Sequence, residues 1–325
     1  MLASGRLPKS STLLWPKPPT MSARTACLWI LSACLLCVPL QAKAQLQPAP
    51  SPQSGPVVIN PTPPEGFRQV HLAAGGPRTA IITAYVRLPK VKPGAKTPAV
   101  VAMHGCGGLF TKKGTFSARH AAWADILTDA GYVVVFPDSF NARGYRQVCT
   151  LKSAERPIRP AHRVHDAFAA LRWLASEPAA DTGRTALLGW SHGGSTLLWA
   201  AAKGAEAVKP DIRLAIAFYP GCRIPAGRAT WGPRVPLSIL IGSADNWTKP
   251  AFCRDLVTRY PQIHLQEYEG AVHGFDAPNS PRRTRRDAGL APDPAVGVEV
   301  GTDPKARAAA IAEVLSRLAR AFASN

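Results

Sequence analysis

Short apolar runs rich in β-branched residues alternate along this chain with segments whose apolar residues recur every three to four positions. Most of the short runs are apolar at nearly every position, which predicts strands buried on both faces of a sheet. These runs begin at Ala80, Pro98, Tyr132, Thr185, Arg213, Pro236 and His264. The segments with helical spacing span residues 116–131, 163–177, 192–204, 251–260 and 303–323. Because strand and helix alternate with short connections, the sequence predicts an α/β fold whose mostly parallel sheet is covered by helices on both faces.

The chain begins with a segment that has the composition of a secretory signal peptide. Met21 is followed by Arg24, by an apolar stretch from Ala26 to Leu40 and by Ala42-Lys43-Ala44, which matches a typical cleavage site. The apolar stretch is shorter than the roughly 20 residues that a membrane-spanning helix requires. We therefore predict export to the periplasm or the medium, with Met21 as the start of translation and no stable membrane insertion after cleavage.

The composition divides the chain into three parts. We predict a signal peptide over residues 1–44, an extended Pro-rich linker over residues 45–70 and one domain of catalytic size over residues 71–325. An alternative stays open for the first part. The sequence LSAC, from Leu31 to Cys34, resembles the lipid attachment site of bacterial lipoproteins.

Four of the seven cysteines lie beyond the predicted signal peptide, namely Cys106, Cys149, Cys222 and Cys253. In an oxidising compartment they can form disulfides, and four cysteines allow three pairings. We favour Cys106 with Cys149 and Cys222 with Cys253, because the loops that hold each pair are expected to lie close together. Four buried thiols are the alternative. Their spacing relative to histidine is not that of a metal site, so we expect no metal.

The chain carries 39 Lys and Arg residues against 20 Asp and Glu residues, a formal net charge of +19. The basic residues are scattered, apart from the run RRTRR at Arg282 to Arg286, and no aromatic residues are interleaved with that run. We therefore predict a solvated surface there and no nucleic-acid partner, with an anionic surface or partner as the alternative. The sequence does not determine whether the surrounding segment, residues 277–302, folds over the functional site of the domain or stays loose.

The sequence GWSHG places Ser191 between the strand that begins at Thr185 and the helix that follows it. A serine on so tight a turn stands at the carboxyl edge of the sheet, where a nucleophile needs a base and an acid from other strand ends. His273 follows the last predicted strand, and Asp245 follows the strand before it. The order Ser, Asp, His is the one that this architecture uses for such a set of residues. Asp276 is the competing acid, but it shares a loop with His273.

Backbone N–H groups for an oxyanion are expected from the loop HGCGG, which follows the strand beginning at Pro98. Cys106 or Gly107 would supply one donor and His192 the other. His104 is expected to brace this loop, and the ring of His192 is expected to take no part in proton transfer.

The long basic segment from Asn141 to Arg159 follows a strand end and is expected to overhang the site. Arg143 and Arg146 are candidates for pairing with a substrate carboxylate. A surface loop pinned by a disulfide at Cys149 is the alternative. The sequence HRVHD that follows opens a helix, and we expect an ion pair between its Arg and Asp rather than a metal site.

Five short segments, HGCGG, FPDSF, LGWSHGG, GSADNW and VHGFD, occur in an order that resembles the dienelactone hydrolase family of α/β-hydrolases. The resemblance spans about residues 75–322 and implies an α/β-hydrolase fold with about eight mostly parallel strands. It also implies that Ser191 is the nucleophile, Asp245 the acid and His273 the base.

The same resemblance implies hydrolysis of a carboxylic ester or lactone through a covalent acyl-enzyme. The namesakes of the family have Cys where this chain has Ser191, and they are intracellular, so the dienelactone substrate itself is not carried over. We expect a small-molecule ester or lactone as substrate. We also expect no cofactor, because acyl transfer by a serine, a histidine and an aspartate needs none. Acyl transfer to an alcohol, cleavage of thioesters or peptides, and binding without turnover are the alternatives.

Overall fold

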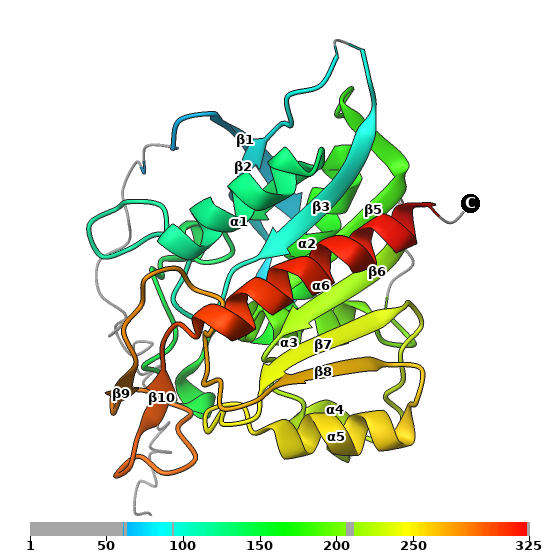
Figure 1. Cartoon of the computed structure of the whole chain (residues 1–325). Helices are drawn as coiled ribbons and strands as arrows, with labels where there is room; N and C mark the ends of the chain where they lie inside the picture. The colour runs from blue at the N-terminus through cyan, green and yellow to red at the C-terminus, as the bar shows by residue number, and fades with distance from the viewer. Residues whose placement is uncertain (1–60, 62–63, 93, 206–210, 324–325) are drawn as a thin grey trace, which may run out of the picture. The chain divides into compact units, whose positions relative to one another are not determined.

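Eight strands form one sheet in the computed structural model, which describes residues 61, 64–92, 94–205 and 211–323 (Figure 1). The predicted signal peptide and most of the predicted linker lie outside the described residues. The strands are β1 (Phe67–Ala74), β2 (Ala80–Arg87), β3 (Thr97–Met103), β4 (Val133–Pro137), β5 (Ala180–Trp190), β6 (Ile212–Phe218), β7 (Leu237–Gly242) and β8 (His264–Tyr268). Their order across the sheet is β1-β2-β4-β3-β5-β6-β7-β8, and only β2 runs opposite to its neighbours. The predicted fold class is confirmed.

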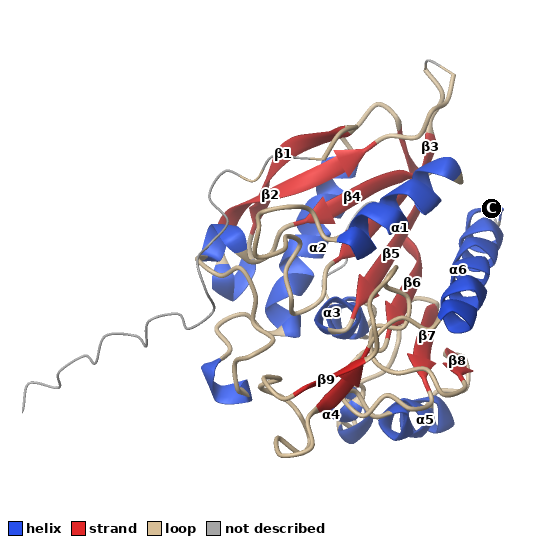
Figure 2. Ribbon diagram, turned by 60° about the vertical axis from the view of Figure 1, so that its left-hand side comes forward, coloured by secondary structure: helices blue, strands red, loops and turns tan. Residues whose placement is uncertain are grey.

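Helices cover both faces of this sheet. They are α1 (Ala118–Asp129), α2 (Pro160–Leu174), α3 (His192–Ala200), α4 (Arg223–Gly227), α5 (Pro250–Arg259) and α6 (Pro304–Ala323). Helices α1 and α6 lie on the face turned toward the viewer in Figure 1, and α2 and α3 lie behind the strands; Figure 2 gives a second view. Among the described residues, no helix combines the length and the hydropathy that crossing a membrane requires.

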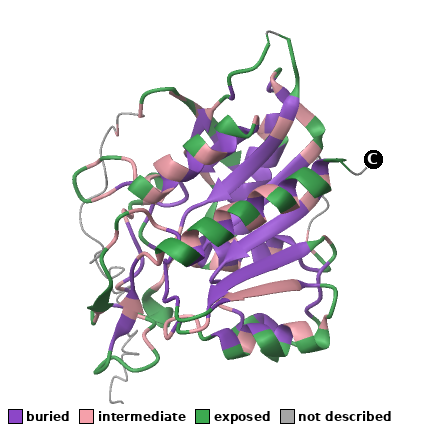
Figure 3. Ribbon diagram, in the orientation of Figure 1, coloured by how far each residue is buried: buried purple, intermediate pink, exposed green. Residues whose placement is uncertain are grey.

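The core follows from the apolar patterns in the sequence. Every residue of β4 and β7 is buried, and Figure 3 shows the central strands buried along most of their length. Helix α6 contributes one stripe, because its buried residues recur every four positions: Ala306, Ala310, Val314, Leu318 and Phe322. Burying each large apolar side chain stabilises the fold by about 1.5–3 kcal/mol. The buried strands therefore form the core that supports the loops at the carboxyl edge of the sheet.

Strand β1 has no counterpart among the predicted strands. It begins at Phe67, inside the range predicted as linker, and pairs antiparallel with β2 over its whole length. Only Leu72 and Ala74 in it are buried. An edge strand exposes much of its surface to water, so its sequence lacks the continuous apolar run that marks the central strands.

Candidate active site

Ser191 lies on the turn between β5 and α3 with a backbone conformation that is rare for a residue with a side chain. Its φ is 52° and its ψ is −111°. Hydrogen bonds hold the turn from both sides: the Ser191 N–H donates to the Phe218 carbonyl (2.9 Å), and the Ser195 N–H donates to the Ser191 carbonyl (2.7 Å). The turn therefore presents the serine side chain at the carboxyl end of β5.

The two glycines of the GWSHG motif are required by close backbone contacts. A Cβ at Gly189 would lie 2.8 Å from the carbonyl carbon of Gly193, and a Cβ at Gly193 would overlap the Met103 carbonyl oxygen. A side chain at either position would push β5, α3 and the end of β3 apart.

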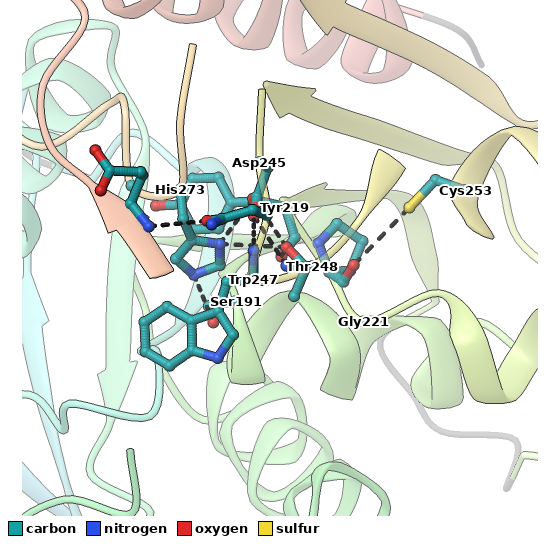
Figure 4. A network of polar contacts seen from close by, with 12 residues as sticks. Ser191, Tyr219, Gly221, Asp245, Trp247, Thr248, Cys253 and His273 are labelled. Carbon is teal, nitrogen blue, oxygen red and sulfur yellow. Dashed lines mark hydrogen bonds and ion pairs between the residues drawn. The ribbon is translucent and has the colours of Figure 1, made fainter. Parts of the chain in front are cut away.

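Ser191, His273 and Asp245 come together in an unbroken chain of hydrogen bonds (Figure 4). His273 Nε2 lies 3.0 Å from Ser191 Oγ, and His273 Nδ1 lies 2.8 Å from Asp245 Oδ2. Asp245 and His273 are 2% and 5% exposed. The arrangement shields the pairing of the imidazole with the carboxylate from water, which strengthens it.

The Asp245 carboxylate is held by the residues that follow it in the loop after β7. Its Oδ1 accepts hydrogen bonds from the backbone N–H groups of Trp247 (2.9 Å) and Thr248 (2.8 Å). The Thr248 hydroxyl lies 2.9 Å from Asp245 Oδ2 and 3.2 Å from His273 Nδ1. These contacts fix the carboxylate behind the imidazole.

Asp276, the competing acid, is bonded elsewhere. Its carboxylate accepts hydrogen bonds from Trp123 Nε1 (2.8 Å) and from the Tyr219 hydroxyl, and it forms an ion pair with Arg119 (3.3 Å). Because these groups surround both of its oxygens, the structure brings Asp245 and not Asp276 to His273 Nδ1.

Tyr219 and Trp247 are residues of the site that the sequence did not indicate. The ring centroids of Tyr219 and Trp247 lie 4.5 Å and 4.7 Å from that of His273. Burial raises the pKa of the Tyr219 hydroxyl well above its usual value, which keeps it a neutral donor to Asp276. Both residues follow strand ends, Tyr219 after β6 and Trp247 after β7. Their positions after strand ends were the only signal in the sequence that could have placed them in the site. That signal is weak, because an aromatic residue after a strand usually belongs to the core.

The loop of residues 104–108 lies directly beside Ser191. A Cβ at Gly105 would lie 3.7 Å from the Ser191 Cβ and 3.3 Å from the Trp190 carbonyl oxygen. The N–H groups of Cys106, Gly107 and His192 donate to no acceptor among the described residues. These are the three groups predicted from the sequence as oxyanion donors.

The two histidines next to these donors are neutral and buried. His104 Nε2 accepts a hydrogen bond from the Ser139 N–H (3.1 Å), so its Nδ1 carries the proton that is donated to the Gly105 carbonyl (2.8 Å). His192 Nδ1 accepts a hydrogen bond from Arg163 (3.0 Å). Burial, reinforced by the charge of Arg163, lowers the pKa of both rings well below the usual value. Both rings are thus bonded within the protein.

The structure corrects two sequence predictions for charged residues. The guanidinium of Arg143 forms two hydrogen bonds to Asp166 (2.7 and 3.0 Å) and others to backbone carbonyls. Its charge is neutralised inside the protein, so it is not positioned to hold a substrate carboxylate. The predicted pair of Arg163 with Asp166 does not form either, because Arg143 occupies the Asp166 carboxylate and Arg163 bonds to His192 instead.

Arg146 is in a different state from Arg143. It is half-buried, desolvation lowers its pKa, and it has no hydrogen-bond or ion-pair partner among the described residues.

In the described part of the chain, no group of three or more His, Cys, Asp or Glu side chains could hold a metal ion.

The cysteines form the two disulfides that the sequence favoured, Cys106 with Cys149 and Cys222 with Cys253. The first joins the loop beside Ser191 to the loop after β4. The second joins the loop after β6 to α5. Each bond therefore links two segments that follow different strands of the sheet.

Residues 277–302 fold back onto the loops of the site. Within this segment β9 (Arg283–Arg285) and β10 (Val298–Val300) pair antiparallel, on the side of the sheet to which β3 and β5 point (Figure 1). The Gly301 N–H donates to the His273 carbonyl (3.2 Å), and the Glu299 N–H donates to Asn246 Oδ1 (2.8 Å). The question that the sequence left open is thereby answered: the segment covers the loops that carry Asp245 and His273.

The basic run RRTRR belongs to this covering segment. Arg282 pairs with Glu299 and Arg285 with Asp287, and the Arg285 guanidinium lies 5.4 Å from the centroid of the Trp247 ring. One side of the Trp247 ring is therefore close to His273 and another is close to the covering segment.

A mostly parallel eight-stranded sheet, with a serine on a tight turn between its fifth strand and the next helix, defines an α/β-hydrolase. The dienelactone hydrolase family model matches residues 82–322. The chain belongs to the dienelactone hydrolase family, and its class of activity is carboxylic ester hydrolysis.

Individual relatives agree with this assignment. The esterase LipI of Mycobacterium tuberculosis is 29% identical over 251 residues, which cover 75% of this chain and 67% of the relative. A dienelactone hydrolase-like promiscuous phosphotriesterase from metagenomic libraries has a similar structure, with a TM-score of 0.54 and 21% identity over 79% of this chain and 98% of that one. For esterase 2 of Thermogutta terrifontis, phosphorylated by paraoxon, the TM-score is 0.52 and the identity 18%, over 80% and 95%. At these identities the two structures support the fold alone.

Proposed function

We propose that this protein hydrolyses a carboxylic ester or lactone through an acyl-enzyme formed on Ser191. The observation that supports this most directly is the hydrogen-bond chain from Ser191 Oγ through His273 to Asp245, with distances of 3.0 and 2.8 Å. A serine hydroxyl is a weak nucleophile until a base removes its proton, and this chain provides the base and the group that orients it.

In the proposed mechanism His273 Nε2 takes the proton of Ser191 as Oγ attacks the substrate carbonyl carbon. Asp245 holds the imidazole by its Nδ1–H and stabilises the imidazolium that forms. His273 then gives the proton to the leaving alcohol, and an acyl group remains on Ser191. A water molecule, deprotonated by His273, then attacks this acyl group. His273 returns the proton to Ser191 Oγ as the bond between Oγ and the acyl carbon breaks and the acid is released.

The negative charge on the carbonyl oxygen is proposed to be bound by two backbone donors. The N–H of His192 is at the N-terminus of α3, where the helix dipole also favours an anion. The N–H of Cys106 or of Gly107 supplies the second donor. Loss of one such donor typically lowers kcat by about 10²- to 10³-fold.

The substrate is proposed to be a small ester or lactone outside the cytoplasm. Two disulfides are compatible with an oxidising compartment, which agrees with the predicted signal peptide. The relative LipI is described as an esterase, and a serine nucleophile suits esters in general. The backbone of Arg146 contacts Gly108 in the loop of residues 104–108, and its side chain has no partner among the described residues. Arg146 is therefore the remaining candidate for contact with an anionic group on the substrate.

Covalent labelling tests the proposed nucleophile. A fluorophosphonate should react with the folded protein and leave one adduct, which peptide mass spectrometry locates at Ser191. Ser191→Ala should remove both the adduct and the hydrolysis of aryl esters while the protein stays folded. A folded wild-type protein that forms no adduct would contradict the proposal, and a panel of esters, lactones, thioesters and peptides then identifies which acyl compound is turned over fastest.

A further inference from the structure

Cys106 connects the loop beside Ser191 to a second loop through a covalent bond. It lies in the loop of residues 104–108, and its sulfur is bonded to that of Cys149. Both residues are buried, with 6% and 5% of their surface exposed. The Cys106 carbonyl also accepts a hydrogen bond from the Val148 N–H (2.8 Å). One disulfide and one backbone hydrogen bond therefore join the two loops at the same point.

The backbones of the two loops are also in direct contact. Gly108 has a φ of +81°, and a Cβ at this position would overlap the carbonyl oxygen of Arg146. No side chain separates the loops here, so a shift of one changes the position of the other.

The second loop is held firmly around Cys149. The Cys149 N–H donates to Gln147 Oε1 (2.6 Å), and the Cys149 carbonyl accepts hydrogen bonds from the Gly289 N–H (2.8 Å) and from Arg156 Nη2 (3.4 Å). Arg156 Nε also donates to the Leu151 carbonyl (3.0 Å). Cys149 is thus bonded to its own loop and to the covering segment of residues 277–302.

Within the loop of residues 104–108 the backbone has fewer such contacts. Two hydrogen bonds within the loop end on the Gly105 carbonyl, from the Gly108 N–H (3.2 Å) and from His104 Nδ1 (2.8 Å), whereas the N–H groups of Cys106 and Gly107 have no acceptor among the described residues. These free donors are the ones proposed for the oxyanion. Their positions depend on what holds Cys106.

We propose that the Cys106–Cys149 disulfide is a positioning element of the oxyanion hole, and that Cys149 is therefore a positioning residue for catalysis. This inference rests on the proposed function. An oxyanion donor acts only when it lies about 2.7–3.1 Å from the developing charge. The disulfide transfers the rigidity of the loop around Cys149 to the N–H group at Cys106 or Gly107.

The two disulfides of the chain form a matched pair for a test. The Cys106–Cys149 bond spans 43 residues and the Cys222–Cys253 bond spans 31. Loop-closure entropy depends only weakly on loop length, so the loss of either bond should lower the melting temperature by a similar amount. A purely structural role predicts similar effects on activity as well, whereas a positioning role predicts different ones.

The experiment compares Cys149→Ala with Cys253→Ala, each of which leaves one unpaired thiol. For an aryl ester, Cys149→Ala should lower kcat by about 10- to 100-fold and change KM by less than about twofold. The affinity for a trifluoromethyl ketone, whose adduct with Ser191 mimics the tetrahedral intermediate, should fall in parallel with kcat. Cys253→Ala should keep kcat within about threefold of the wild-type value.

The outcomes separate the inference from the proposed function. A wild-type protein that neither reacts with a fluorophosphonate nor hydrolyses esters overturns the proposed function. If the wild-type protein is active and Cys149→Ala loses no more activity than Cys253→Ala, only the inference is overturned.

Controlled reduction of the wild-type protein gives the same test without substitution, in case Cys149→Ala does not fold. A phosphine reductant opens a disulfide to two thiols and is itself oxidised, and alkylation followed by mass spectrometry reports which pair has opened. Activity should be lost as Cys106 and Cys149 become alkylated and retained while only Cys222 and Cys253 are. Retained activity in molecules alkylated at Cys106 and Cys149 overturns the inference.

Discussion

Ser191 adopts a positive φ of 52° that a residue with a Cβ avoids unless its surroundings impose it. Such a conformation costs about 1–3 kcal/mol. The Phe218 carbonyl and the Ser195 N–H supply the hydrogen bonds that offset this cost. The strain is located at the one residue whose side chain has to project from the sheet edge toward His273.

The two carboxylates near His273 provide a prediction at the scale of single residues. Asp245→Asn should lower kcat by about 10³- to 10⁴-fold, because an amide cannot hold the imidazole in the required tautomer. Asp276→Asn should lower kcat much less and should lower the free energy of unfolding by about 3 kcal/mol, because it leaves the charge of Arg119 without its partner. Steady-state kinetics and urea unfolding of both variants check this. Equal losses of kcat in the two variants would contradict the assignment of Asp245, and not Asp276, as the acid that orients His273.

At the scale of elements, the loop after β4 performs two tasks with neighbouring residues. Arg143 ties the loop to α2 through Asp166, whereas Arg146, three residues later, has no partner among the described residues. Sequence reasoning treated the two arginines alike. The structure separates them, because only Arg143 reaches a buried carboxylate on a neighbouring element.

Arg146 should therefore affect charged substrates selectively. With two aryl esters that differ only by a carboxylate, Arg146→Ala should lower kcat/KM for the anionic ester by about tenfold or more and leave the neutral ester nearly unchanged. Arg146→Lys should restore part of the difference. Lys152→Ala, which removes an exposed positive charge from the same loop, is the matched control. An equal effect of Arg146→Ala on both esters would exclude a contact with the anionic group.

On the scale of the whole molecule, the site depends on segments that are distant in sequence. Loops after β3, β4, β6, β7 and β8 meet around Ser191, and the segment of residues 277–302 binds to three of them. The parallel sheet brings these loops to one edge. Anything that loosens the sheet as a whole therefore also separates Ser191, His273 and Asp245.

We expect His120 to make the folded protein less stable at low pH. Its ring is buried among Phe116, Phe136 and Trp190, and burial, reinforced by the charges of Arg119 and Arg163, lowers its pKa from 6.5 to about 3. Between those values the unfolded chain binds a proton that the folded protein excludes. The free energy of unfolding should therefore fall with decreasing pH, by up to about 1.4 kcal/mol per pH unit from this residue.

Replacing His120 with Leu should make stability less sensitive to acid. Urea unfolding at pH 7.5, 6, 5 and 4.5 gives the slope of stability against pH, which is independent of any constant loss from altered packing. The variant should have a shallower slope than the wild-type protein. An unchanged slope would show that His120 does not contribute to acid sensitivity.

The sequence predicted most of the sheet and the order of the site residues for a clear physical reason. Central parallel strands are apolar at nearly every position, and the residues at their carboxyl ends face one edge of the sheet, so Ser191, Asp245 and His273 could be placed relative to strands. Strand β1 and the pair β9 and β10 were not predicted, because their exposed residues carry no such pattern. Tyr219 was not predicted as a residue of the site, because its place there depends on contacts with His273 and Asp276, which are far away in the sequence.

By itself, the sequence determined the α/β architecture, the tight turn at Ser191 and the family, because apolar periodicity and short motifs are local properties. Only the tertiary structure decided which carboxylate faces His273, which arginine is neutralised and where residues 277–302 lie. Each of these depends on the distance between groups brought together by folding. Hydrogen bonds and ion pairs form within about 3–4 Å, and no spacing along the chain encodes such a distance between separate loops.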